Sequence, residues 1–155
     1  MVHRMKFVCG VGPTGWPSLT AHIDGQSLSA LAEAYERSRG YTDPAGGYGG
    51  FELIHVTIRS DGQHFVGCDH PKESTETERF LALACECGDP GCWPLTVRVR
   101  VVGEKVIWDR FAQPHRPGRD YREFGPFAFE RAQYCAALEE ARAAAQQGLK
   151  EFEES

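Results

Sequence analysis

The chain has 155 residues, which fits one domain with a buried core, and its hydrophobic content of 41% and charged content of 25% are ordinary for a globular protein. A net charge of −5 argues against binding to nucleic acid, because such binding favours a basic surface that neutralises phosphates. No apolar run approaches membrane-spanning length, and the opening residues lack the apolar centre of a secretory signal, so we expect a cytoplasmic protein that binds no membrane.

The first predicted elements are two short strands, Met5 to Cys9 and Leu19 to Ile23, where apolar and polar residues alternate. The glycine-rich loop between them (residues 10–15, GVGPTG) is formally a dinucleotide-type G-x-G-x-x-G. That motif requires a helix at its last glycine, with backbone N–H groups directed at a pyrophosphate. Pro13 removes one of these N–H groups and a strand pattern follows, so we interpret the segment as a loop joining two strands.

A helix and a loop follow. Ser27 is a typical N-cap residue, and the apolar spacing behind it predicts a helix that ends near Arg39-Gly40. The loop of residues 40–50 (the 40–50 loop) holds five glycines and one proline, a composition that predicts a mobile surface loop. Residues 51–59 alternate as a strand, and a turn leads them into residues 64–68 to form a hairpin.

The second half of the chain is predicted to contain a short helix, a hairpin and a long helix. Thr75 and Glu78 have the spacing of a capping box, which predicts a short helix carrying Phe80, Leu81 and Leu83. Residues 95–102 and 105–109 alternate as a second hairpin, and residues 110–126 are predicted to be irregular. A long helix follows from about residue 130, with an apolar stripe formed by Tyr134, Leu138, Ala141, Ala145, Leu149 and Phe152.

This order of elements predicts an α+β fold. We expect a small antiparallel sheet of hairpins with two or three helices on one face, the C-terminal helix being the longest. No linker divides the chain, so residues 1–155 are predicted to form a single domain, and the polar tail from about residue 148 is expected to fray.

Three of the six cysteines crowd into one stretch, "CECGDPGCWPL", as Cys85, Cys87 and Cys92. In a chain without an export signal, cysteines favour free thiols or metal ligands over a disulfide framework. Two glycines and an Asp-Pro pair within this cysteine turn (residues 85–92) allow the backbone to fold tightly enough for three thiolates to converge. Because Zn²⁺ takes four sulfur or nitrogen ligands in a tetrahedron, we predict that the three cysteines bind zinc.

The fourth ligand is predicted to be His115, because two prolines hold it on a stiff segment and the hairpin of residues 95–109 returns the chain to the same end of the sheet. Cys68 and His70 are the rival ligands, and Cys9 is a further candidate. Buried packing of the thiols, an iron–sulfur cluster that would also need Cys68, and a redox pair are the alternatives to zinc.

The spacing C-x-C-G-x-x-x-C resembles the post-SET motif of histone lysine methyltransferases, in which three cysteines and a distant fourth bind zinc. Cys85, Cys87, Gly88 and Cys92 match it. The chain lacks the Asn-His-Ser-Cys segment of those enzymes and carries the motif in mid-chain, so the resemblance implies the metal geometry and no methyltransferase activity. The segments "CECGDPGCWPL", "QPHRP" and "FGPFAFERAQY" also resemble a group of uncharacterised bacterial proteins, which implies no function.

We therefore expect a small soluble zinc-binding domain that acts as a binding or interaction module. Its predicted contact surfaces are the 40–50 loop and the arginine–aromatic segment (residues 108–131), and its partner an unknown protein or a small anionic ligand. Surface ion pairs with Asp109, Asp120 and Glu123 are the simpler interpretation of these arginines. The alternative function is a zinc-dependent or thiol-based enzyme that uses the same cysteines, with His115 and Asp109 or Asp120 as an acid–base pair.

Overall fold

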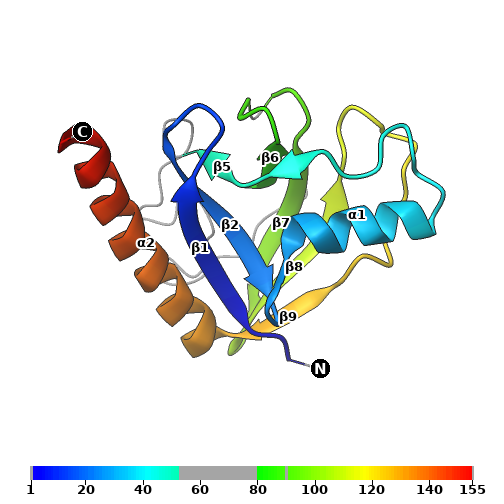
Figure 1. The fold of residues 1–155 in the computed structure, drawn as a ribbon. Coiled ribbons are helices and arrows are strands. Elements are labelled where there is room, and N and C mark those ends of the chain that lie inside the picture. Colours follow the sequence, from blue (N-terminus) through cyan, green and yellow to red (C-terminus); the bar gives the residue numbers. More distant parts are fainter. Residues whose placement is uncertain (1, 53–79, 90, 155) are drawn as a thin grey trace.

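The computed structural model describes residues 2–52, 80–89 and 91–154 of the chain. These residues form two antiparallel sheets and two helices, so the predicted α+β class is confirmed, as is the expectation that the C-terminal helix is the longest (Figure 1). The described strands divide into two sheets where we expected one.

The first sheet contains β1 (Met5–Val11), β2 (Pro17–Ile23), β3 (Gln26–Ser27) and β5 (Phe51–Glu52), with β2 pairing with each of the others. The β1–β2 register runs from Met5 opposite Ile23 to Val11 opposite Pro17. The glycine-rich loop is therefore the connection of a hairpin, as predicted. Alternate residues of β2 are buried and face the core, which explains its strand pattern.

The second sheet has the order β4 (Tyr48–Gly49), β6 (Phe80–Cys85), β7 (Leu95–Val102), β8 (Lys105–Ala112) and β9 (Phe127–Glu130). The predicted hairpin of residues 95–109 is confirmed as β7 and β8, although β8 continues for three residues beyond the predicted end. The short strand β9, which pairs with β8, was not predicted.

The short helix predicted to carry Phe80, Leu81 and Leu83 is wrong, because these residues form strand β6. Consecutive residues from Ala82 to Cys85 are all buried, so both faces of the strand are covered. A strand buried on both faces has a continuous apolar run, which periodicity cannot distinguish from a buried helix. The capping-box residues and the predicted hairpin beyond Glu52 lie outside the described residues.

Helix α1 (Leu28–Ser38) begins where it was predicted, because the Oγ of Ser27 accepts a hydrogen bond from the backbone N–H of Ala30 at 3.2 Å. Helix α2 (Arg131–Glu154) lies along β1 and β2 (Figure 1) and buries Tyr134, Leu138, Ala141 and Ala145 of the predicted stripe. It continues to Glu154, through the segment where we expected fraying. Neither described helix is both long and apolar enough to cross a membrane.

Side chains of both sheets and both helices contribute to one hydrophobic core. At one end of the molecule, the top in Figure 1, four connections gather: the glycine-rich loop, the cysteine turn, the 40–50 loop and the chain after β8. Sequence-distant residues therefore meet at this end, and the predicted metal site lies there.

Candidate metal centre

The cysteine turn begins at Cys85, the last residue of β6, and is shaped by backbone hydrogen bonds. The N–H of Gly88 donates to the carbonyl oxygen of Cys85 at 2.9 Å, and the N–H of Cys92 donates to the carbonyl oxygen of Asp89 at 3.3 Å. Gly88 has a φ of +97°, a conformation that side chains with a Cβ rarely adopt. The glycine after the second cysteine is therefore required by the backbone of the turn.

The ligand atoms of Cys85, Cys87 and Cys92 all lie within 4.8 Å of one another. A tetrahedral zinc site with Zn–S bonds of about 2.3 Å places its sulfur atoms about 3.8 Å apart, so small side-chain adjustments would fit the cluster around an ion. Cys85 is buried, whereas Cys87 and Cys92 are exposed to solvent. In the part of the chain that the structure describes, no other group of three or more His, Cys, Asp or Glu residues converges in this way.

The three thiols influence one another directly. A hydrogen bond from the backbone N–H of Asp89, with a second from Cys85, lowers the pKa of Cys87. Hydrogen bonds from Cys92 to Cys85 and to Cys87 raise the pKa of Cys92 to about 11. The turn thus favours a thiolate at Cys87, and a bound divalent cation would favour the thiolate form of all three.

His115, the predicted fourth ligand, lies beside the cysteine turn but outside the group of converging sulfurs. Its Nε2 is 2.9 Å from the carbonyl oxygen of Gly91, and its ring stacks on that of Trp93 with 6.3 Å between centroids and 8° between planes. Its role as a ligand therefore stays a prediction.

The remaining candidate ligands are Cys9, Cys68 and His70. Cys68 and His70 lie outside the described residues. Cys9 packs near α2, where its thiol is 3.8 Å from the carbonyl oxygen of Ala144. Cys135 is disulfide-bonded and offers no free thiol.

The cysteine turn is attached to the 40–50 loop. Trp93, which directly follows the last cysteine, donates a hydrogen bond from Nε1 to the carbonyl oxygen of Gly46 at 2.9 Å. The N–H of Glu86 donates to the carbonyl oxygen of Gly47 at 2.9 Å, and Tyr48 pairs with Cys85 between β4 and β6. Composition predicted a mobile surface loop here, but hydrogen bonds to the cysteine turn hold its second half, and Tyr48 is buried.

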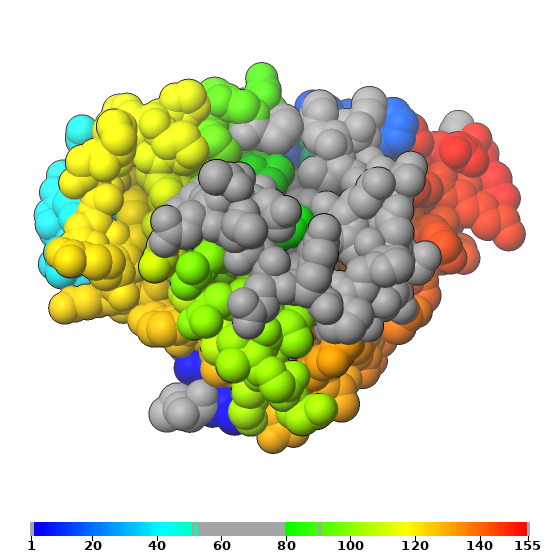
Figure 2. Space-filling model, turned by 180° about the vertical axis from the view of Figure 1, so that it is seen from behind, coloured from blue at the N-terminus to red at the C-terminus, as the bar shows by residue number. Residues whose placement is uncertain are grey.

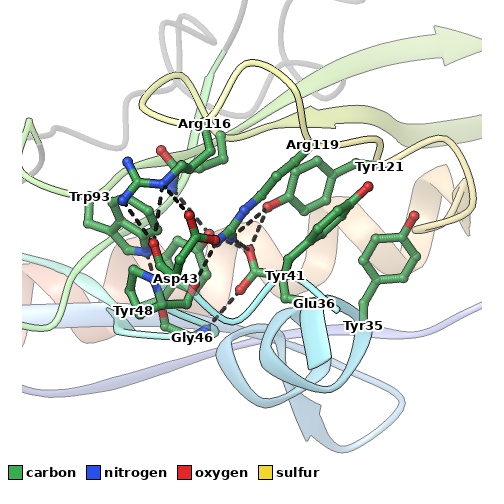
Figure 3. Close-up of polar contacts among 12 residues, drawn as sticks. Tyr35, Glu36, Tyr41, Asp43, Gly46, Tyr48, Trp93, Arg116, Arg119 and Tyr121 are labelled. Atoms are coloured by element: carbon green, nitrogen blue, oxygen red, sulfur yellow. Dashed lines mark hydrogen bonds and ion pairs between the residues drawn. The ribbon is translucent and has the colours of Figure 1, made fainter. Parts of the chain in front are cut away.

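A fully buried carboxylate, Glu36 of α1, anchors the same loop (Figure 3). The N–H of Gly46 donates to its Oε1 at 2.8 Å, and the hydroxyls of Tyr48 and Tyr121 donate to its Oε2 at 2.6 and 2.5 Å. The guanidinium of Arg119, whose side chain is 4% exposed, lies 3.1 Å from Oε2. Burial, reinforced by Glu36, raises the pKa of both tyrosines, that of Tyr121 to about 12, so both hydroxyls remain donors at neutral pH.

This network reaches His115 through one further side chain. Buried Gln113 donates from Nε2 to the hydroxyl of Tyr48 at 3.1 Å and accepts at Oε1 from the N–H of His115 at 3.0 Å. Arg119 also contacts the 40–50 loop, with hydrogen bonds to Asp43 and to the carbonyl oxygen of Pro44. The position of His115 beside the turn is therefore determined by contacts that begin at Glu36.

Sequence reasoning did not identify Glu36 as a buried structural residue, although its position in the helix pattern indicated burial. Leu28, Ala32 and Glu36 are spaced four residues apart and all are buried, so a charged residue interrupts the apolar stripe of α1. A carboxylate in that position requires buried donors, which other parts of the chain had to supply.

A second carboxylate, Glu52 of β5, was also missed and is fully buried. Its Oε2 accepts hydrogen bonds from the N–H and the hydroxyl of Thr14, in the glycine-rich loop, at 3.3 and 2.5 Å. No sequence pattern marked it, because its partner belongs to a loop that precedes it by almost forty residues.

Three arginines of the arginine–aromatic segment, Arg116, Arg119 and Arg122, form ion pairs, and that of Arg122 with Asp120 is one that the simpler interpretation predicted. Asp120 pairs with Arg122 at 2.8 Å, and this contact lowers the pKa of Asp120 to about 2. Asp109 pairs with Arg98 and Arg100, which are outside the segment. Asp109 and Asp120 thus contact arginines and not His115, so these contacts do not form the acid–base pair predicted for the alternative enzyme function.

Figure 2 shows the surface of the arginine–aromatic segment (yellow) bordering that of the cysteine turn (green, top). The guanidinium of Arg116 lies 4.9 Å from the centre of the Trp93 ring and also pairs with Asp43. This edge of the molecule therefore combines thiols, an indole and paired guanidinium groups.

No protein-family model, curated protein sequence or solved structure matches this chain. Its function must therefore be inferred from the residues of the site themselves.

Proposed function

We propose that this protein is a small zinc-binding domain in which the ion has a structural role, and that the domain acts as a binding or interaction module. The observation that carries the proposal is the convergence of three cysteine ligand atoms within 4.8 Å on a turn shaped by glycine. Thiolates select zinc over the hard cations magnesium and calcium. The post-SET-like spacing of the cysteines supports the same assignment.

His115 is our proposed fourth ligand. Its imidazole already contacts the cysteine turn at Gly91, and Gln113 and Trp93 hold it there. An imidazole with three thiolates completes one of the common structural zinc sites. The proposed partner, a protein or a small anionic ligand, would contact the neighbouring arginine–aromatic segment.

Elemental analysis of the full chain, purified without a histidine tag, tests the zinc site. We expect about one zinc ion per chain, lost in Cys92→Ser and retained in the control Cys9→Ser. A strong chelator should lower the melting temperature by about 10 °C, because metal binding contributes several kcal/mol to folding and each kcal/mol corresponds to about 2–4 °C in a chain of this size. A metal-free protein whose melting temperature ignores chelators would refute the proposal.

A metal-dependent or thiol-based enzyme is the second candidate, favoured by the solvent exposure of Cys87 and Cys92. His115→Ala separates the two functions. Loss of zinc and of thermal stability supports a structural site, whereas a stable, zinc-loaded variant with solvent as the fourth ligand supports a catalytic one.

A further inference from the structure

Glu52 is a buried carboxylate that is only half satisfied. Its side chain is fully buried, and both hydrogen bonds from Thr14 go to Oε2. Oε1 has no hydrogen-bond partner among the described residues. Burying a carboxylate oxygen without a donor costs free energy, so the position of Oε1 requires a physical reason.

The carboxylate lies between the glycine-rich loop and the cysteine turn. A Cβ added to Gly12 or to Gly88 would overlap the carboxylate group of Glu52, with Oε1 on the side of Gly88. The same added Cβ on Gly88 would lie 3.2 Å from Pro13, so the two loops are in direct contact there. Both glycines are therefore needed to admit Glu52, and one of them directly follows the ligand Cys87.

We propose that Glu52 is a positioning residue of the metal centre, which holds the cysteine turn from outside the ligand set and favours a cation in it through its charge. This inference rests on the proposed function, because it assigns an outer carboxylate to the same three-cysteine site. The glycine-rich loop then has the role of packing against Glu52 and donating hydrogen bonds to it. This role accounts for the G-x-G-x-x-G sequence, which the dinucleotide interpretation did not explain.

The charge of Glu52 can act on an ion in the cysteine turn because its side chain is buried. Charges interact more strongly where the surroundings exclude water, and solvent screens an exposed charge. Glu86 provides the matched comparison, because it lies between two of the cysteines in the sequence but is exposed. Removing one negative charge at Glu52 should therefore affect the ion more than removing one at Glu86, although Glu86 is closer to the ligands along the chain.

The test compares wild type, Glu52→Gln and Glu86→Gln in titrations with Co²⁺ as the zinc probe. Absorption from sulfur-to-cobalt charge transfer reports binding, and competition with a chelator gives Kd. We expect Glu52→Gln to raise Kd about tenfold or more, the usual effect of losing an outer partner of a metal site, and Glu86→Gln to change it less than about threefold. Equal effects of the two variants, or an unchanged Kd in Glu52→Gln, would overturn the inference.

The metal-free proteins separate this role from simple packing. Glu52→Gln keeps the side-chain shape and removes a buried, half-satisfied charge, so we expect its metal-free melting temperature to equal or exceed that of wild type. A packing residue would instead lower metal-free stability and leave Kd unchanged. That outcome refutes the positioning role.

A second pair of variants tests the position of the Glu52 side chain without changing any charge. Gly12→Ala places its Cβ against the Glu52 carboxylate, whereas Gly10→Ala, two residues earlier at the end of β1, meets no atom within 4 Å. We expect the first to weaken Co²⁺ binding and the second to leave it unchanged, and equal Kd values would count against the inference. If wild type itself binds no metal, the proposed function is refuted together with the role of Glu52. If wild type binds metal and neither Glu52→Gln nor Gly12→Ala weakens binding, only the role of Glu52 is refuted.

Discussion

Glu36 and Glu52 are both fully buried carboxylates, but their surroundings satisfy them differently. Glu36 receives one backbone donor and two tyrosine hydroxyls, and it pairs with a buried arginine. Among the described residues, Glu52 receives its two donors on one oxygen alone. A buried carboxylate whose two oxygens both have hydrogen-bond donors stabilises the structure around it. A buried carboxylate with one oxygen lacking a donor is a candidate for a functional role.

Replacing Glu36 with alanine should be strongly destabilising. The change leaves two tyrosine hydroxyls buried without their acceptor and removes the buried partner of Arg119, and loss of one partner of a buried ion pair costs about 3–5 kcal/mol. Urea denaturation measures the free energy of unfolding. The control Glu33→Gln, which removes an exposed helix ion pair with Arg37, should cost less than about 0.5 kcal/mol. A loss below about 1 kcal/mol for Glu36→Ala would show that the network does not anchor the fold.

At the scale of elements, β6 is the strand that delivers the cysteine turn. It pairs with β4 and β7, and it ends at Cys85. Because its last residues are covered on both faces, the turn that follows starts from a firmly packed position. Glu52 on β5 belongs to the other sheet but also lies near β6, so the cysteine turn is positioned by both sheets.

Leu83→Ala tests this packing. Leu83 is fully buried in β6, and its truncation should lower the free energy of unfolding by about 2–5 kcal/mol, because it removes apolar contacts and leaves a cavity. Val102→Ala, at the exposed end of β7, is the matched control and should cost less than about 1 kcal/mol. Urea denaturation compares the two. Similar small losses would contradict the assignment of β6 to the core.

At the scale of the whole molecule, the four connections at one end form a single set of contacts. The cysteine turn touches the glycine-rich loop through Glu52, the 40–50 loop through Trp93 and the chain after β8 through His115. An ion that holds three cysteines of the turn should therefore restrain its neighbours as well.

Hydrogen exchange with and without a chelator measures this coupling. We expect removal of the ion to speed exchange at least about tenfold at the N–H of Glu86 and at the indole N–H of Trp93, because both bond to the 40–50 loop from the cysteine turn. Amides of the β1–β2 hairpin at its far end, such as those of Met5 and Ile23, should exchange at unchanged rates. Uniform acceleration throughout the chain would indicate global destabilisation in place of local coupling.

Much of the fold could be predicted from local patterns. The alternation in residues 19–23 and 95–102, the N-cap at Ser27 and the apolar stripe of the last helix each depend on neighbours along the chain, and each prediction is confirmed. The helix predicted at residues 80–83 failed for a physical reason. In β6 the apolar run has no period because both faces are buried, and only pairing with two other strands distinguishes it from a helix.

The sequence by itself determined that three cysteines and their glycines would share one tight turn, because the residues that shape that turn lie within it. Only the tertiary structure decided what surrounds it: Glu52 in contact with Gly88, Trp93 bonded to Gly46, and His115 beside Gly91. These contacts join residues far apart in the chain, and their geometry follows from how two sheets pack. Spacing within a turn is a local property, whereas the burial and partners of a carboxylate depend on the whole fold.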